Sequence, residues 1–175
     1  MILNKFLLIY KLINLMSILN DLLEKIQDNV DPNYPISLDY NPKYNDDPKH
    51  WTCLMIGPEG TPYSNGYFRL TIDFTEDPPK KPPEIRFSTK IYHLNINDDG
   101  HVCLKSNNNF GEGEDFEKVF YEIYFLFIKQ NPESTWTKFS DRKELYVNKR
   151  EEFDRIASEW TKEYATEAES NKIYE

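Results

Sequence analysis

The segment from Tyr67 to Phe74 alternates between apolar and polar side chains, and this period of two constrains the fold more than any other feature of the sequence. Such alternation is typical of a β-strand with one face in the core and the other in solvent. Residues 51–57 and 84–88 give two further strand predictions, and residues 36–40 give a weaker one. Turn residues separate these segments, so we predict a four-stranded antiparallel meander sheet.

Helical periodicity flanks the predicted strands on both sides. Apolar residues at helical spacing predict an N-terminal helix over residues 18–26, which Asp31-Pro32 brings to an end. Residues 116–128 keep a helical apolar pattern and carry further apolar side chains on the other faces, which predicts a central helix buried nearly all round. Residues 150–165 predict a last, amphipathic helix. The order helix, strands, helices indicates the α+β class.

Length and composition favour one globular domain and disfavour some classes of partner. The chain has 175 residues, 15% of them aromatic, which is enough for a sizeable core. Its 21 Lys and Arg against 30 Asp and Glu give a net charge of -9, which disfavours nucleic acid and an anionic membrane as partners. Cys53 and Cys103 are the only cysteines and form no paired motif. We therefore expect a reducing compartment, the cytoplasm and also the nucleus.

The first sixteen residues are strongly apolar, but Lys5, Lys11 and Asn14 interrupt them. A transmembrane helix needs about 20 consecutive apolar residues, and a signal peptide needs an unbroken apolar centre with a small-residue cleavage site. We therefore expect neither. Three interpretations stay open: an amphipathic extension of the first helix, a peripheral membrane anchor, and translation that begins at Met16.

Cys103 is the strongest candidate for chemistry. It follows a turn-rich segment in which Asn95 lies eight residues upstream. A thiol and an amide donor are the pair needed to form and break a thioester, because the amide stabilises the tetrahedral oxyanion. Cys53 instead stands among apolar residues of a predicted strand, where a cysteine is most simply a small buried side chain. Cys103 is therefore the predicted nucleophile.

Several motifs in fixed order accompany this cysteine. The turn reads His93-Leu94-Asn95 and the cysteine setting Val102-Cys103-Leu104. The other motifs lie at residues 51–66, 68–74, 82–87, 131–132 and 150–165. In order and spacing this set resembles the ubiquitin-conjugating enzymes, in which a His-Pro-Asn turn precedes the active cysteine. We expect residues 17–168 to form the ubiquitin-conjugating (UBC) core domain, between the extension 1–16 and a short polar tail at 169–175.

The resemblance implies an acyltransferase that needs neither a metal nor a cofactor. Cys103 would accept ubiquitin, or a related modifier, as a thioester from an activating enzyme and pass it to a substrate lysine or a ligase cysteine. Asn95 would hydrogen-bond the oxyanion, His93 would brace the turn, and Leu104 completes the cysteine motif. The implied partners are the modifier, the activating enzyme, a ubiquitin ligase and a protein substrate. We expect a monomer.

Some positions depart from the family pattern. Leu94 replaces the proline of the turn, whose fixed φ is thereby lost. Lys105 and Ser134 stand where many members carry acidic residues that orient the incoming amine. Since Lys105 repels an ammonium group, we expect lysine to be a poor acceptor and a HECT or RBR-type ligase cysteine to be a better one.

The ligase-docking positions also differ. Many family members use an aromatic residue and a Ser-Pro-Ala loop to bind RING-type ligases, whereas the corresponding positions here are Lys80 and the loop that ends at Gly113. The resemblance therefore implies that familiar ligases recognise this surface less well.

The same residues allow other interpretations. One alternative is a catalytically weak binding module with the UBC fold. A Cys-His-Asn hydrolase would use the same side chains, but a base acting on the thiol makes a nucleophile rather than a stored thioester. A zinc site formed by His93, His101, Cys103, Asp98 and Asp99 does not match the usual ligand spacing, and His101 is most simply a solvent-facing residue.

Overall fold

The computed structural model describes residues 36–39, 49–74, 83–104, 116–133 and 140–171. All of them belong to one compact unit of the chain, residues 35–175. The predicted N-terminal helix and the apolar extension lie outside the described residues. Within the described residues, no helix combines the length and the apolar character that crossing a membrane requires.

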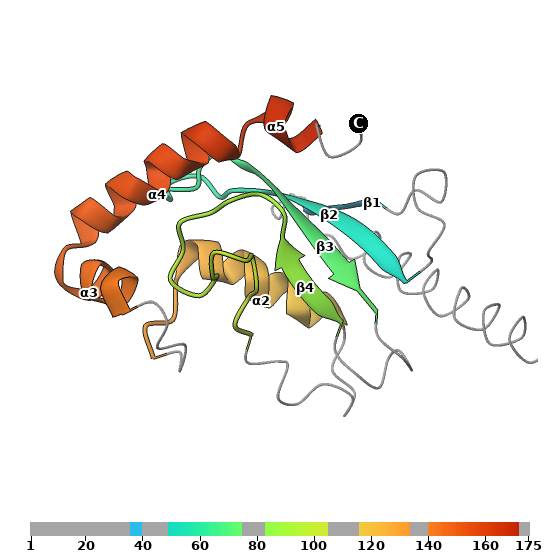
Figure 1. Ribbon diagram of the computed structural model, residues 1–175, viewed down its shortest axis with the longest axis horizontal. Coiled ribbons are helices and arrows are strands. Elements are labelled where there is room, and N and C mark those ends of the chain that lie inside the picture. Colours follow the sequence, from blue (N-terminus) through green and yellow to red (C-terminus); the bar gives the residue numbers. More distant parts are fainter. Residues whose placement is uncertain (1–35, 40–48, 75–82, 105–115, 134–139, 172–175) are drawn as a thin grey trace, which may run out of the picture. The chain divides into compact units, whose positions relative to one another are not determined.

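An antiparallel sheet forms one layer of the fold. Strands β1 (Ile36–Asp39), β2 (His50–Ile56), β3 (Tyr67–Asp73) and β4 (Glu84–Phe87) pair in sequence order (Figure 1). The predicted α+β class with an antiparallel sheet is confirmed by the pairing of β2, β3 and β4 together with the helices that follow. The alternation that predicted β3 holds except at one position. Arg69 is buried rather than exposed, because residues 88–89 fold over it and bond to its backbone.

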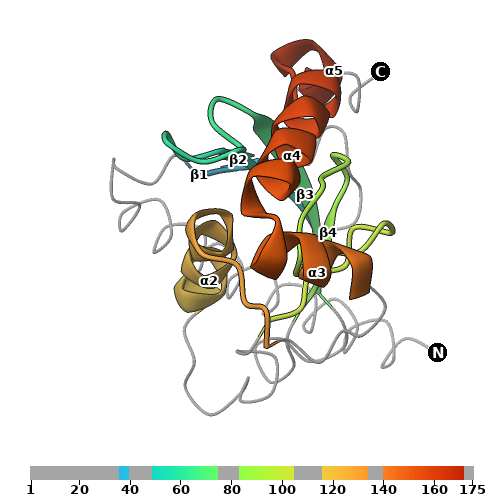
Figure 2. The same cartoon turned by 90° about the vertical axis from the view of Figure 1, so that its left-hand side faces the viewer.

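Helix α2 (Phe116–Ile128) packs one face against the sheet (Figure 2). Its Phe127 ring lies 5.0 Å from the ring of Phe68 on β3 and 5.9 Å from that of Phe87 on β4. The prediction that this helix is buried nearly all round is wrong. Phe125 is 49% exposed and Ile128 is 48% exposed, because a helix that lies on one side of a sheet buries only the facing stripe.

Three helices follow α2 in the described residues: α3 (Ser140–Asn148), α4 (Arg150–Tyr164) and α5 (Glu167–Asn171). The predicted amphipathic helix over 150–165 is confirmed as α4, which buries Phe153, Ala157 and Thr161. Its end is tied to the start of β3, because the Tyr67 N–H donates to the carbonyl of Ala165 over 2.8 Å. The helices therefore hold the sheet and the loop after β4 in place.

Candidate active site

The chain from Tyr92 to Leu104 folds into a compact turn structure after β4. Isolated bridges pair His93 with Ile96 and Ile96 with Val102. The backbone N–H of Cys103 donates to the carbonyl of Asn95 over 2.9 Å. The two residues predicted to do the chemistry are thus held next to one another by backbone contacts.

Asn95 is fully buried, and both ends of its side-chain amide bond to one residue. Its Nδ2 donates to the Asn131 carbonyl over 2.8 Å, and its Oδ1 accepts from the Asn131 N–H over 2.8 Å. This pair of bonds fastens the turn to the loop that follows α2. Nδ2 carries a second N–H besides the one that Asn131 accepts.

His93 is also fully buried and serves as a neutral brace. Its Nε2 lies 3.0 Å from the carbonyl of Leu126, and its Nδ1 accepts the N–H of Asn95 over 2.9 Å. The proton therefore sits on Nε2. Burial lowers the pKa of His93 to about 4, the bond to Leu126 partly opposes that shift, and the positive charge of Arg142 adds to it. A buried imidazole in this state is no base for the thiol.

Gln130 fastens the turn at Leu94, the position where the family has a proline. The N–H of Leu94, which proline would lack, donates to Gln130 Oε1 over 2.7 Å. Gln130 Nε2 donates to the Tyr63 hydroxyl over 2.8 Å, and that hydroxyl donates to the Tyr92 carbonyl over 2.8 Å. Gln130 and Tyr63 are both buried. The sequence did not point to either residue, although a polar residue two positions after the end of an apolar helix is a signal that could have pointed to Gln130.

Arg142 on α3 supports the same turn from another side. Its Nη1 donates to the carbonyls of Ile96 over 3.1 Å and His93 over 3.3 Å, and its Nη2 pairs with Asp98. Its guanidinium carbon stands 4.7 Å above the ring of Tyr92, which adds a cation–π contact. Arg142 is 8% exposed, so a residue that the sequence presents as surface charge is part of the site's framework.

Cys103 itself is half-buried at the end of an extended stretch, and Leu104 after it is buried. This stretch can run beside β4 because Gly100 turns the chain with a φ of +82°. A Cβ at Gly100 would stand 2.1 Å from the carbonyl oxygen of Phe87, so no other residue fits there. Four further predicted positions lie outside the described residues: Lys80, Lys105, Gly113 and Ser134.

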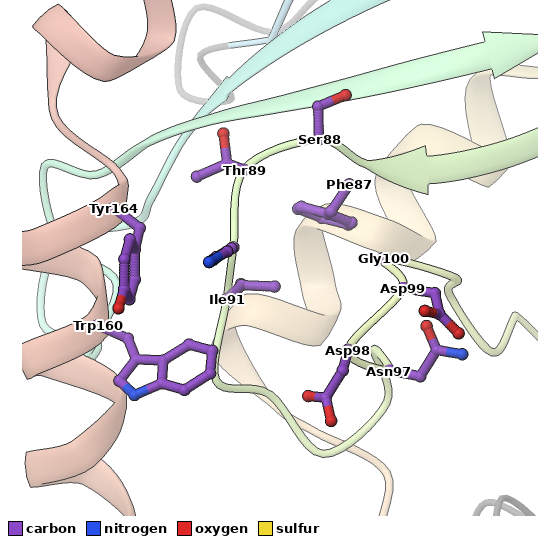
Figure 3. A pocket seen from close by; sticks show the side chains of 11 residues that line it. Phe87, Ser88, Thr89, Ile91, Asn97, Asp98, Asp99, Gly100, Trp160 and Tyr164 are labelled. Carbon is purple, nitrogen blue, oxygen red and sulfur yellow. The ribbon is translucent and has the colours of Figure 1, made fainter.

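A hollow of 440 Å³ lies beside the turn that precedes Cys103. Trp160 and Tyr164 of α4 stand on one side of it, and Asp98 and Asp99 stand on the other (Figure 3). The charge of Asp98 is balanced in part by Arg142 of α3, with which it forms an ion pair. In the part of the chain that the structure describes, no three His, Cys, Asp or Glu side chains are grouped to hold a metal ion.

Comparison with known families gives a match that covers most of the chain. The family model of the ubiquitin-conjugating enzymes matches residues 18–161, which include the turn, Cys103 and α4 up to Thr161. The chain therefore belongs to the ubiquitin-conjugating enzyme family. Members of this family work with ubiquitin, an activating enzyme and ubiquitin ligases.

Proposed function

We propose that this protein accepts ubiquitin, or a related modifier, as a thioester on Cys103 and transfers it to a substrate lysine or a ligase cysteine. The observation that carries the proposal is the half-buried Cys103 thiol held against the Asn95 turn by a 2.9 Å backbone hydrogen bond. Membership of the family supports it, because the matched residues span this whole arrangement.

The chemistry has two acyl-transfer steps. In the first, the Cys103 thiolate attacks the modifier's C-terminal carbonyl, and the thiol of the activating enzyme leaves. In the second, an amine or a thiol attacks that carbonyl, and the C–S bond to Cys103 breaks. Each step passes through an oxyanion, and the second Nδ2 hydrogen of Asn95 is the donor we assign to it. A donor of this kind is worth about 3 to 4 kcal/mol in other oxyanion holes.

We also propose an oligomeric state, a location and an architecture for the enzyme. We infer a monomer of the cytoplasm and also of the nucleus, with an N-terminal helix, a four-stranded meander and a core domain over residues 17–168. A net charge of -9 suits partners with basic surfaces. The reaction uses energy already stored in the thioester that the activating enzyme delivers, so neither ATP nor a metal is assigned to this chain.

A charging assay tests the proposal. The full chain is mixed with ubiquitin, an activating enzyme and ATP, and the products are separated with and without a reducing thiol. We expect an adduct that disappears when the thiol is added. The absence of such an adduct with ubiquitin and with related modifiers would contradict the proposal and favour a UBC-fold binding module.

A further inference from the structure

His101 lies on the same face of the chain as Cys103. Residues 101–104 are alternately half-buried and buried, with His101 and Cys103 half-buried and with Val102 and Leu104 at 7% and 6% exposure. In an extended chain, residues two apart stand on one side, separated by about 7 Å. An imidazole and the predicted nucleophile therefore share one open surface.

The neighbouring strand brings two charged residues to this surface. Arg86 on β4 pairs with His101 in an antiparallel bridge, and the N–H of Phe87 donates to the Gly100 carbonyl over 2.8 Å. In this register Glu84, two residues before Arg86, falls opposite Cys103. Side chains of β4 alternate, so Glu84 and Arg86 stand on its exposed face. They face the same side as the cysteine.

Two contacts link these partly exposed side chains. Nδ1 of His101 lies 3.7 Å from Oε1 of Glu84, and Nε of Arg86 donates to that same oxygen over 2.9 Å. The guanidinium fixes the carboxylate, and the carboxylate faces one imidazole nitrogen. A carboxylate that favours the proton on Nδ1 leaves the Nε2 lone pair as the acceptor. This is the arrangement of a general base oriented by a third group.

We propose that His101, positioned by Glu84, takes the proton of the acceptor amine when the thioester on Cys103 is aminolysed. This inference rests on the proposed function. The amine nitrogen forms the new C–N bond, the C–S bond breaks, and its electron pair leaves on Cys103 Sγ. One proton of the amine passes to His101 Nε2 and from there to the solvent. The histidine thereby supports the transfer to lysine that the sequence predicts to be slow, because Lys105 stands where many family members carry an acidic residue.

Lysine and cysteine acceptors separate this role from a structural one. An amine must lose a proton to give a stable amide, whereas a thiolate attacks without a base. Loss of His101 as a base therefore slows transfer to lysine and spares transfer to cysteine. A merely structural loss would slow both reactions and the charging step as well.

The experiment charges the full chain with ubiquitin, removes ATP and the activating enzyme, and follows single-turnover discharge into lysine and into cysteine. The variants are His101→Gln, Glu84→Gln and Glu84→Asp, with His50→Gln as the matched control on β2. We expect His101→Gln to slow lysine discharge about 10²-fold while charging and cysteine discharge change less than about twofold. Glu84→Gln should slow lysine discharge less than His101→Gln does, and Glu84→Asp should discharge to lysine faster than Glu84→Gln. His50→Gln should match the parent.

The inference would be overturned by lysine discharge that is the same in the parent and in His101→Gln, or by equal slowing with lysine and cysteine. A parent that charges but gives no measurable lysine discharge would also overturn it. A parent that never forms the thioester contradicts the proposed function instead, so the two failures are distinguishable. Added imidazole should restore lysine discharge in His101→Ala, which a packing role would not allow.

Discussion

The regions around the two cysteines are held by different means. Cys53 lies inside β2, where Leu38 and Leu70 are its register partners, and it is fully buried. Burial raises the pKa of the Cys53 thiol far above its ordinary value. Cys103 follows a turn that side chains fasten to backbone atoms, and it is half-buried. Burial inside the sheet makes the Cys53 thiol unreactive. The Cys103 thiol is only half-buried, and its position depends on the side-chain contacts that hold the turn.

The alkylation rates of the two thiols give the largest expected difference between the two regions. In the native protein we expect Cys103 to react with iodoacetamide at least about 10³-fold faster than Cys53, because a buried thiol forms little thiolate and reacts only after the sheet opens. Mass spectrometry of peptides from native and denatured protein measures both rates. Comparable native rates for the two thiols would contradict the contrast between the two regions.

Substitution of Asn95 tests the turn's role in chemistry. We expect Asn95→Ala to leave charging largely intact but to slow discharge roughly 10²-fold or more, since it removes the oxyanion donor. The variant also leaves the Asn131 N–H without its 2.8 Å acceptor, which lowers the melting temperature. Single-turnover discharge and thermal unfolding are measured on the same samples. A lower melting temperature with an unchanged discharge rate would show that Asn95 is only a brace.

The buried imidazole of His93 predicts a pH dependence of stability. Its pKa falls from an ordinary 6.5 to about 4 on folding, so between these values the unfolded chain binds a proton that the folded chain excludes. The stabilisation is complete above the unfolded value and is lost as the pH falls. We expect the difference in unfolding free energy between parent and His93→Gln to shrink by about 2 kcal/mol from pH 7 to about pH 4.5.

Urea unfolding across this pH range measures the effect. A difference between parent and variant that does not change with pH would mean that His93 is not held neutral by burial.

The bond between Leu94 and Gln130 predicts a loss of stability of similar size, which a second substitution should partly reverse. Gln130→Leu removes the acceptor of the buried Leu94 N–H and should cost about 2 kcal/mol of unfolding free energy. A second change, Leu94→Pro, removes the stranded donor and restores the family's turn residue. We expect the double variant to be more stable than Gln130→Leu alone. Additive losses, measured by a double-mutant cycle, would contradict the account of this turn.

The sequence predicted what depends on local periodicity. The strands over 51–57 and 67–74 and the helix over 150–165 follow from a period of two and a helical period, and the structure has all three. The sequence did not predict burial where burial depends on residues far away along the chain. Helical spacing puts Phe127 on the apolar stripe and Phe125 off it, but an apolar side chain on the other face does not show by itself whether that face is covered.

The residues of the candidate site could likewise be predicted only in part. The sequence pointed to Cys103 and Asn95, which the structure holds together through one backbone hydrogen bond. The sequence did not point to Gln130, because its hydrogen-bond partners Leu94 and Tyr63 lie 36 and 67 residues away along the chain. The sequence also did not point to Arg142. A polar helix gives no sign that one of its arginines bonds to the carbonyl of Ile96, 46 residues earlier.

The central claim is that Cys103 alone holds the modifier, and charging of the two cysteine variants tests it most directly. Cys103→Ser should form an oxyester with ubiquitin that survives a reducing thiol, because the serine oxygen replaces the sulfur as nucleophile. Cys53→Ser should charge like the parent and lose its adduct when the thiol is added. A folded Cys53→Ser variant that fails to charge, or a Cys103→Ser variant that still forms a thiol-sensitive adduct, would contradict the claim.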